Sequence, residues 1–271
     1  PTTYLGGGVD PDPDGQPSSD AGEVAGGDDG DGNDDETGVV EPSMIFRGEQ
    51  ASFTVNVTTN TTAYVYGYID WNNDDDFNDA NEVQWKVATS SGPVTLIFDV
   101  PLNAATNIDL GARFRVGTVQ DQVDQATGFA MDGEVEDYLV QVKGLDYGDL
   151  PDFFAGVSTG DYQTNYANNG PRHGVPATPQ LFLGAVIDVD ADGQPDLGAG
   201  EDGTGGDDND GDATGDDEDG VVGPPMIFRG EEASFAVTLN LTNLTGTTAY
   251  VYGYIDWNGH GTLGDTPAEI A

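Results

Sequence analysis

Short runs of alternating apolar and polar residues dominate residues 39–143. In the run "AYVYGYI" at 63–69, three tyrosines at even positions alternate with Val65, Gly67 and Ile69, which is the two-residue period of a β-strand. Similar runs rich in β-branched and aromatic residues, such as "ASFTVNV" and "PVTLIFDV", are separated by Gly, Asn, Asp and Pro. No helical period interrupts them. About seven short strands in such a length predict an all-β fold, an antiparallel β-sandwich of the Ig-like or jelly-roll kind.

The tyrosine face of this run has two interpretations. We favour a sheet face that is packed or covered by another part of the chain. The alternative is an exposed platform that binds sugars through aromatic rings, with Trp71, Trp85 or Tyr64 as the contact residues.

The chain also repeats itself. "DGQP" at 14–17 returns at 192–195, and "MIFRGE" at 44–49 returns at 226–231. The longest repeat, "TTAYVYGYIDWN" at 61–72, returns at 247–258. The shifts of 178, 182 and 186 residues indicate one unit of about 180 residues, with length changes confined to loops.

These patterns predict four regions. Residues 1–38 are the end of an acidic connector, and 39–143 form the first sandwich. Residues 144–220 form a second connector, and 221–271 form the first half of a second sandwich. Half a sandwich is not expected to be stable alone, so we expect it to be completed by further chain, or by a neighbouring molecule that donates strands.

Charge narrows the choice of partners. The chain has 50 acidic and 7 basic residues and a formal net charge of −43, which disfavours nucleic acids and anionic membranes. Bound metal ions, high salt or disorder must offset this repulsion. No apolar run approaches the 18 residues of a membrane span, and the absence of Cys excludes disulfides and thiolate metal sites.

Part of this charge lies in two copies of an acidic turn. The pattern D-x-D-x-D-G places three carboxylates around a glycine bend and a following carbonyl, which are the oxygen ligands that Ca²⁺ prefers. Each copy has a Glu nine residues after the third Asp, in place of the usual closing Glu. A solvated acidic turn is the alternative. The predicted ligands are Asp10, Asp12, Asp14, Gln16 (through its carbonyl) and Glu23, and Asp188, Asp190, Asp192, Gln194 (through its carbonyl) and Glu201.

A third calcium site is predicted within the first sandwich, in "DWNNDDDFNDANE" at 70–82. Asp75 stands where such loops have glycine, so we expect it to adopt an unusual φ angle. In the second copy His260 replaces the central carboxylate, which predicts a weaker site. The Gly/Asp tracts at 26–38 and 205–220 either hold further ions or serve as flexible spacers. The predicted ligands of the third site are Asp70, Asn72, Asp74, Asp76 (through its carbonyl) and Glu82.

The segment "DGEVEDYLVQV" at 132–142 resembles the GEVED-type domain of large bacterial secreted and cell-surface proteins. The following "LDYGDLPDFF", "PRHGV" and "DVDADGQP" segments are similar to the connectors in those tandem arrays. The resemblance covers nearly the whole chain. It implies an extracellular β-sandwich repeat with a calcium requirement and a structural or adhesive role, and it implies no catalytic residues.

Within the signature, Asp132, Glu134 and Glu136 share one face of a strand. Arg113 and Arg115 share a face of another, so we predict a cross-strand ladder of opposite charges. The alternative is that the glutamates turn toward a metal.

Outside the signature, His173 is interpreted as a structural hydrogen-bonding residue, because no nucleophile or metal partner accompanies it. The aspartates of "DYGDLPD" (Asp146, Asp149, Asp152) are expected to cap or coordinate.

The sequence thus favours a secreted or cell-surface structural protein that is not an enzyme. Its Ca²⁺-rigidified repeats would build a stalk, adhesin or filament, with neighbouring repeats or other copies as partners. One alternative is a module that binds surface glycans, and another is an acidic surface protein of a salt-loving organism without specific metal sites.

Overall fold

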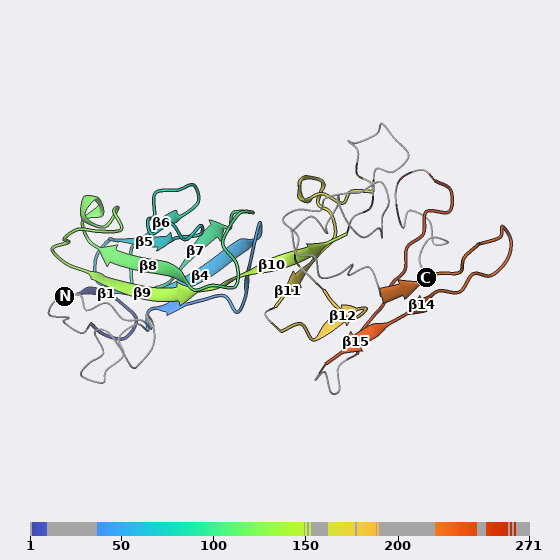
Figure 1. The fold of residues 1–271 in the computed structure, drawn as a ribbon. Coiled ribbons are helices and arrows are strands. Elements are labelled where there is room, and N and C mark those ends of the chain that lie inside the picture. Colours follow the sequence, from blue (N-terminus) through green and yellow to red (C-terminus); the bar gives the residue numbers. More distant parts are fainter. Residues whose placement is uncertain are drawn as a thin grey trace. The chain divides into compact units, whose positions relative to one another are not determined.

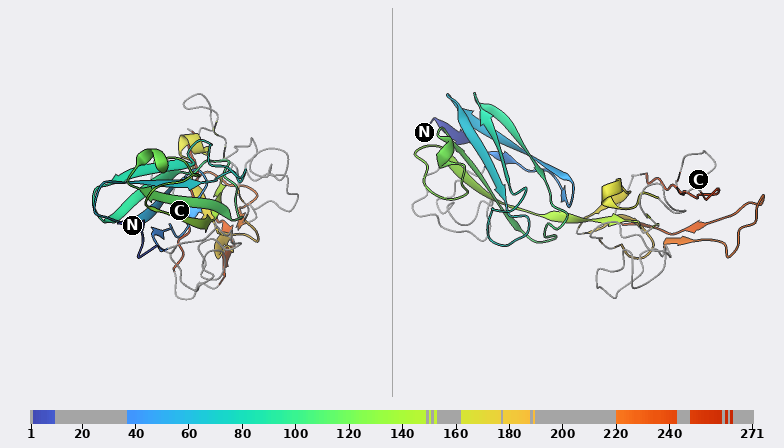
Figure 2. Two further views of the ribbon diagram at one scale, coloured as in Figure 1. Left: turned by 90° about the vertical axis from the view of Figure 1, so that its left-hand side faces the viewer. Right: turned by 90° about the horizontal axis from the view of Figure 1, so that it is seen from above.

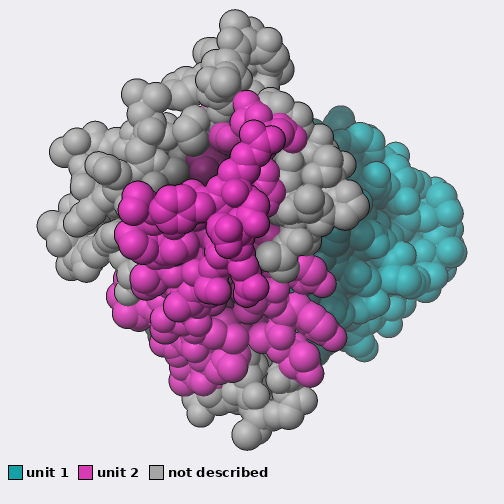
Figure 3. Space-filling view, turned by 90° about the vertical axis from the view of Figure 1, so that its right-hand side faces the viewer, with its two compact units in different colours: residues 1–143 teal, residues 144–271 magenta. Residues whose placement is uncertain are grey.

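The computed structural model describes residues 2–9, 37–148, 150, 152, 162–176, 178–187, 189, 220–242, 248–259, 261 and 263. The chain divides into two compact units, residues 1–143 and 144–271, which Figure 3 distinguishes by colour. Among the described residues, the regular secondary structure consists almost entirely of β-strands. The helical segments there are the short turns η2 (Gln120–Gln122) and η3 (Tyr166–Asn168), and neither has the length or apolar character to cross a membrane.

Unit 1 is a β-sandwich, as the alternation predicts. One sheet contains β1 (Thr3–Leu5), β2 (Val39–Val40), β4 (Gln50–Thr59) and β7 (Gly92–Asp99). The other has the order β6 (Val83–Ala88), β5 (Ala63–Ile69), β8 (Leu110–Gly117) and β9 (Glu134–Val140). All pairings within these two sheets are antiparallel, and Figure 2 shows their strands as two layers.

Aromatic side chains from both sheets meet in the core. Phe53 of β4 contacts Phe98 of β7 and Phe114 of β8, each with ring centroids 5.6 Å apart. Trp71, which follows β5, packs its ring edge-on to Phe98 at 6.0 Å. All four side chains are at most 1% exposed, and burying each contributes roughly 1.5–3 kcal/mol. These contacts between layers hold the two sheets together.

The alternation in β5 separates two environments. Val65 and Ile69 point into the core between the sheets. Tyr66 and Tyr68 pack on the opposite face against Val123, from the loop that joins β8 to β9. The prediction that the tyrosine face is covered is therefore confirmed.

The edge of β4 that β7 leaves open is occupied by two short strands. β7 pairs with β4 along residues 50–57, so β1 and β2, which pair with residues 57–59 and 54–55 of β4, lie on its other edge. Asn56 lies between them. Its carbonyl accepts the N–H of Gly6 at 2.9 Å, and its own N–H donates to the carbonyl of Gly38 at 2.7 Å. The chain therefore leaves this edge at Gly6 and rejoins it at Gly38. We call β1 and β2 together the split edge strand.

The described fold has four further strand pairings. The short strand β3 (Ile45–Phe46) pairs in parallel with the start of β10 (Val142–Tyr147), and β11 (Arg172–Val175) pairs antiparallel with β10. In unit 2, β12 (Leu181–Leu183) pairs with β15 (Leu239–Leu241), and β13 (Val221–Val222) pairs with β14 (Ala236–Val237).

The pairings of unit 2 match those of the split edge strand. Leu183 lies opposite Leu239, as Leu5 lies opposite Val57. Thr238 takes the place of Asn56: its carbonyl accepts the N–H of Gly184 at 3.0 Å, and its N–H donates to the carbonyl of Gly220 at 2.8 Å. The sequence similarity between the two copies thus extends to register and backbone hydrogen bonds.

Candidate functional site

The signature strand begins with a glycine that no other residue can replace without strain. Gly133 has a φ of 98°, and a Cβ at this position would collide with the carbonyl oxygen of Val116 on β8. Only glycine adopts this angle and permits this approach at low cost. Gly133 therefore allows β9 to start close against β8.

The two glutamates of the signature hold the split edge strand. A carboxylate oxygen of Glu134 accepts the N–H of Leu5 at the end of β1, and Glu136 Oε1 accepts the N–H of Gly38, just before β2, at 3.0 Å. β1 lies beside β9, although the two strands belong to different sheets (Figure 1). Both ends of the segment between Gly6 and Gly38 are thus fixed to the same strand.

Glu136 is the more deeply buried of the two, with 1% of its surface exposed. Its second oxygen accepts the Tyr138 hydroxyl at 3.0 Å, and that hydroxyl in turn accepts the N–H of Val39 at 3.2 Å. Hydrogen bonds to a charged acceptor contribute about 1.5–3 kcal/mol each, and they offset the cost of burying a carboxylate. Glu136 therefore stabilises the start of β2 directly and through Tyr138.

The predicted charge ladder is wrong. Arg113 lies opposite Asp137 and Arg115 opposite Val135, whereas Glu136 lies opposite the core residue Phe114. The arginines and the two glutamates therefore occupy opposite faces of the sheet. A register shifted by one residue would have brought them together, and strand sequences alone do not determine that shift.

The two arginines bind other partners. Arg113 forms a bidentate ion pair with Asp137, with N···O distances of 2.7 and 2.6 Å. Arg115 is buried and donates to the carbonyls of Gln125, Thr127 and Gly128, the last at 2.8 Å. Arg115 thereby holds the loop between β8 and β9 over the tyrosine face.

Asp70 organises the acidic loop that follows β5. Its Oδ1 accepts the N–H of Asn73 at 2.6 Å and that of Asp74 at 3.2 Å, and its Oδ2 accepts the N–H of Asp75 at 3.0 Å. Asn73 and Asp75 have φ angles of 59° and 70°. The unusual conformation expected for Asp75 is confirmed, and that of Asn73 was not foreseen.

Glu82 closes the same loop from its far end. It is 1% exposed, and its two oxygens accept the N–H of Trp71 at 3.1 Å and that of Asp79 at 3.0 Å. Burial raises the pKa of the Glu82 carboxyl, the two backbone hydrogen bonds oppose this shift, and the charges of Asp70 and Asp79 reinforce it. A cation at this loop would relieve the repulsion among these carboxylates.

The loop contains oxygen ligands suited to a hard cation, but they are not arranged around a single point. Residues 70–82 contain six carboxylates and no Lys or Arg. Asn72, however, directs its amide N–H groups at Asp74 and Asp79, at 3.0 and 2.6 Å, whereas coordination would use its oxygen. Within the described ranges, no three His, Cys, Asp or Glu side chains come together as they would around a metal. The ligand set Asp70, Asn72, Asp74, Asp76 and Glu82 therefore stays a prediction.

The other predicted calcium ligands cannot be compared with the structure. The ligands of both acidic turns, the Gly/Asp tracts before residue 37 and between 205 and 219, and His260 lie outside the described residues. The turn ligands concerned are Asp10, Asp12, Asp14, Gln16, Glu23, Asp188, Asp190, Asp192, Gln194 and Glu201.

The second copy of the acidic loop has the same backbone turn. Asp256 Oδ1 accepts the N–H of Gly259 at 2.6 Å, and its Oδ2 accepts that of Gly261 at 2.9 Å. The φ angles of these glycines are 70° and 87°, as at Asn73 and Asp75. Both copies thus need positive φ at the fourth and sixth loop positions. The paired glycines of "NGHG" were the sequence signal for this turn.

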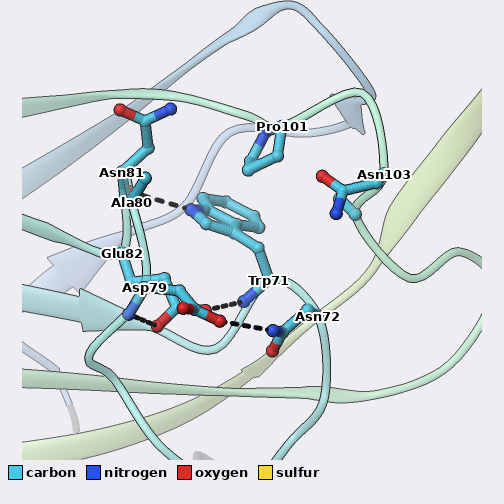
Figure 4. Close-up of a pocket in the computed structure, with 9 residues that line it drawn as sticks. Trp71, Asn72, Asp79, Ala80, Asn81, Glu82, Pro101 and Asn103 are labelled. Atoms are coloured by element: carbon cyan, nitrogen blue, oxygen red, sulfur yellow. Dashed lines mark hydrogen bonds between the residues drawn. The ribbon is translucent and has the colours of Figure 1, made fainter.

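A pocket of about 390 Å³ adjoins the first acidic loop (Figure 4). The indole ring of Trp71 lies beside Pro101 in this view, and its Nε1 donates to the carbonyl of Asn81 at 3.1 Å. Since Trp71 is 1% exposed, it serves the core and not a sugar-binding surface. Trp85 remains 47% exposed, with its ring stacked on Tyr66 at 5.7 Å. The pocket is lined by Trp71, Asn72, Asp79, Ala80, Asn81, Glu82, Pro101, Asn103 and Ala104.

In unit 2, Asp152 caps a turn, one of the two roles expected for it. It accepts the N–H groups of Thr164 and Asn165, both at 2.9 Å, and the side-chain amide of Asn168. Burial would raise the pKa of Asp152, but these hydrogen bonds outweigh it and lower the pKa. Asp146 and His173 lie opposite each other in the β10–β11 pair, and Asp149 lies outside the described residues.

Comparison with known proteins agrees with the geometry of unit 1. No curated protein matches the chain. The family model of the GEVED domain matches residues 64–141, the segment from β5 to the end of β9. That segment contains both the acidic loop and the signature glutamates, whereas the split edge strand and β4 precede it. A GEVED domain is therefore found at residues 64–141.

Proposed function

We propose that this chain is part of an extracellular structural protein built from GEVED sandwiches in tandem, whose acidic connectors bind Ca²⁺ and become rigid. The observation that carries the proposal is the attachment of both ends of an acidic segment to the signature strand, through Glu134 and Glu136. This arrangement ties both ends of the acidic segment to one sandwich, and it does not suit a catalytic site, so we propose no enzymatic activity.

The electrostatics of the attached segment favour a divalent cation. Residues 9–38 contain 11 acidic residues and no basic one. The segment starts and ends on one sheet edge, beside the two glutamates. Repulsion between charges about 6 Å apart is roughly 0.7 kcal/mol per pair in water, and it accumulates over many pairs. Ca²⁺ bound within the segment would remove this repulsion.

The second copy supports a repeated arrangement. Residues 187–220 contain 14 acidic residues and no basic one, and they are flanked by β12 and β13, whose pairings match those of β1 and β2. We propose that Ca²⁺ bound in each such segment also contacts the adjoining module, so that the array is flexible without Ca²⁺ and rod-like with it. A stalk, adhesin or filament on a cell surface needs that property.

The proposal is tested by calorimetric titration of Ca²⁺ into chelator-treated protein, combined with limited proteolysis. We expect binding heat, and protection of residues 10–36 and 191–219 from cleavage at millimolar Ca²⁺. A triple variant, Asp188→Asn with Asp190→Asn and Asp192→Asn, should lose protection of the second segment alone. A matched triple variant at the exposed Asp99, Asp109 and Asp121 should behave like the wild type. Absence of both heat and protection in the wild type would refute the calcium role.

A further inference from the structure

Residues that form the core in the first copy are exposed in the second. Phe53 is 0% exposed, but its counterpart Phe235 is 41% exposed, and Val55 and its counterpart Val237 are 0% and 44% exposed. Trp71 is 1% exposed, whereas Trp257 is 52% exposed. We call Phe235, Val237, Val251 (the counterpart of the core residue Val65) and Trp257 the apolar face of unit 2. Large apolar side chains that one copy buries and the other exposes indicate an interaction site.

The first copy shows what covers such a face. β7 pairs along β4 in a register that places Leu96 opposite Phe53 and Val94 opposite Val55. Phe114 of β8 and Tyr138 of β9 then close the core from the facing sheet, with ring centroids 5.8 Å apart. In the described part of unit 2, segment 236–241 pairs only with β12 and β13, which occupy the edge equivalent to that of the split edge strand. No described strand of unit 2 takes the place of β7.

We infer that the apolar face of unit 2 is a docking face for a polypeptide with the strand pattern of β6–β9. The first docked strand would add to the edge of residues 233–239, with a Val-x-Leu-x-Phe alternation like that of residues 94–98. Its leucine would lie opposite Phe235 and its valine opposite Val237. This inference does not depend on calcium or on the proposed function.

Three features select this partner over a general apolar ligand. The backbone N–H and C=O groups along 233–239 can form hydrogen bonds with an added β-strand. Because Phe235 and Val237 are two residues apart, every second side chain of that strand would face them. The second copy also keeps the backbone register of the first on the opposite edge.

The test uses the full chain and a synthetic polypeptide of residues 83–143 as the probe. Amide hydrogen exchange is followed in residues 232–241 and 248–257 with and without the probe. We expect exchange in these segments to slow by at least about 100-fold at saturation, as for strands that join a core. Phe235→Asp should abolish the protection. The matched variant Ser234→Asp should retain it, because the equivalent Ser52 points to solvent in the first copy.

A second arrangement covers the case in which the free polypeptide aggregates. Residues 85–143 are fused directly after Ala271, and exchange is measured in the same two segments. Protection that Phe235→Asp removes and Ser234→Asp retains, in either arrangement, supports the inference. Unprotected amides in the fusion, or protection that Phe235→Asp leaves intact, overturn it.

Discussion

At the scale of single residues, each position of the signature G-E-V-E-D has a different environment. Gly133 permits the close start of β9, Glu134 and Glu136 bind the split edge strand, and Asp137 pairs with Arg113 on the other face. Val135 is 51% exposed. Successive residues of β9 point to opposite faces of the sheet. Acidic residues therefore occur at even positions (Glu134, Glu136) on one face and at an odd position (Asp137) on the other.

Gly133→Ala should destabilise unit 1 by about 2 kcal/mol or more, because the φ of 98° and the carbonyl of Val116 both exclude a Cβ. Urea denaturation followed by tryptophan fluorescence measures this. Gly111→Ala is the matched control, since a Cβ at Gly111 meets nothing within 4 Å. Equal stability of the two variants would show that the close contact at Gly133 has no energetic weight.

The pKa of Glu82 predicts a pH dependence of stability. Because burial raises the pKa of Glu82 in the folded protein, the folded state retains a proton that the unfolded state has lost. Stability in the presence of a chelator should therefore fall as pH rises from the ordinary range of a glutamate through the raised pKa. Glu82→Gln should lack this fall. A difference in unfolding free energy between variant and wild type that stays constant with pH would contradict it.

At the scale of elements, the longer strands were predictable and the shortest were not. β4, β5, β7, β8 and β9 follow from their alternation. β1 and β2 have three and two residues and lie in or beside a connector, and they form because β4 offers a free edge. Their pairing depends on contacts between residues 14 to 56 positions apart in sequence. Local patterns contain no information on such contacts.

Prediction of the candidate site from sequence was limited in the same way, by contacts between residues far apart in the chain. Asp70 and Glu82 were predicted as calcium ligands, and in the structure both accept backbone N–H groups of the loop, as carboxylates flanking a polar turn do. The roles of Glu134 and Glu136 were missed, because their partners Leu5 and Gly38 lie about 100 or more residues away. The register of β8 and β9 depended on a one-residue shift that neither strand specifies alone.

The loop between β8 and β9 should depend on Arg115. Arg115→Gln removes most of the donors that bind the carbonyls of Gln125, Thr127 and Gly128. Cleavage of residues 118–132 by a protease should then accelerate about 10-fold or more, since one hydrogen bond to a charged group contributes about 1.5–3 kcal/mol. Lys86→Gln, an exposed cation on β6, is the control. Unchanged cleavage in Arg115→Gln would mean that packing on Tyr66 and Tyr68 suffices to hold the loop.

At the scale of the whole molecule, the net charge of −43 produces repulsion that opposes a compact fold. The two arginines of the GEVED segment are committed locally: Arg113 binds Asp137, and Arg115 binds backbone carbonyls. The acidic segments therefore need neutralisation from solution. The central claim is that Glu134 and Glu136 fix the ends of the first acidic segment to the sandwich.

Amide exchange at Leu5 and Gly38 tests this claim most directly, because their N–H groups donate to Glu134 and Glu136. In Glu134→Gln/Glu136→Gln, exchange at both amides should accelerate by about 10-fold or more, while the core amide of Phe53 keeps its rate. Asp137→Asn, on the opposite face of the same strand, should leave Leu5 and Gly38 unchanged. Equal exchange at Leu5 and Gly38 in the wild type and the double variant would contradict the account.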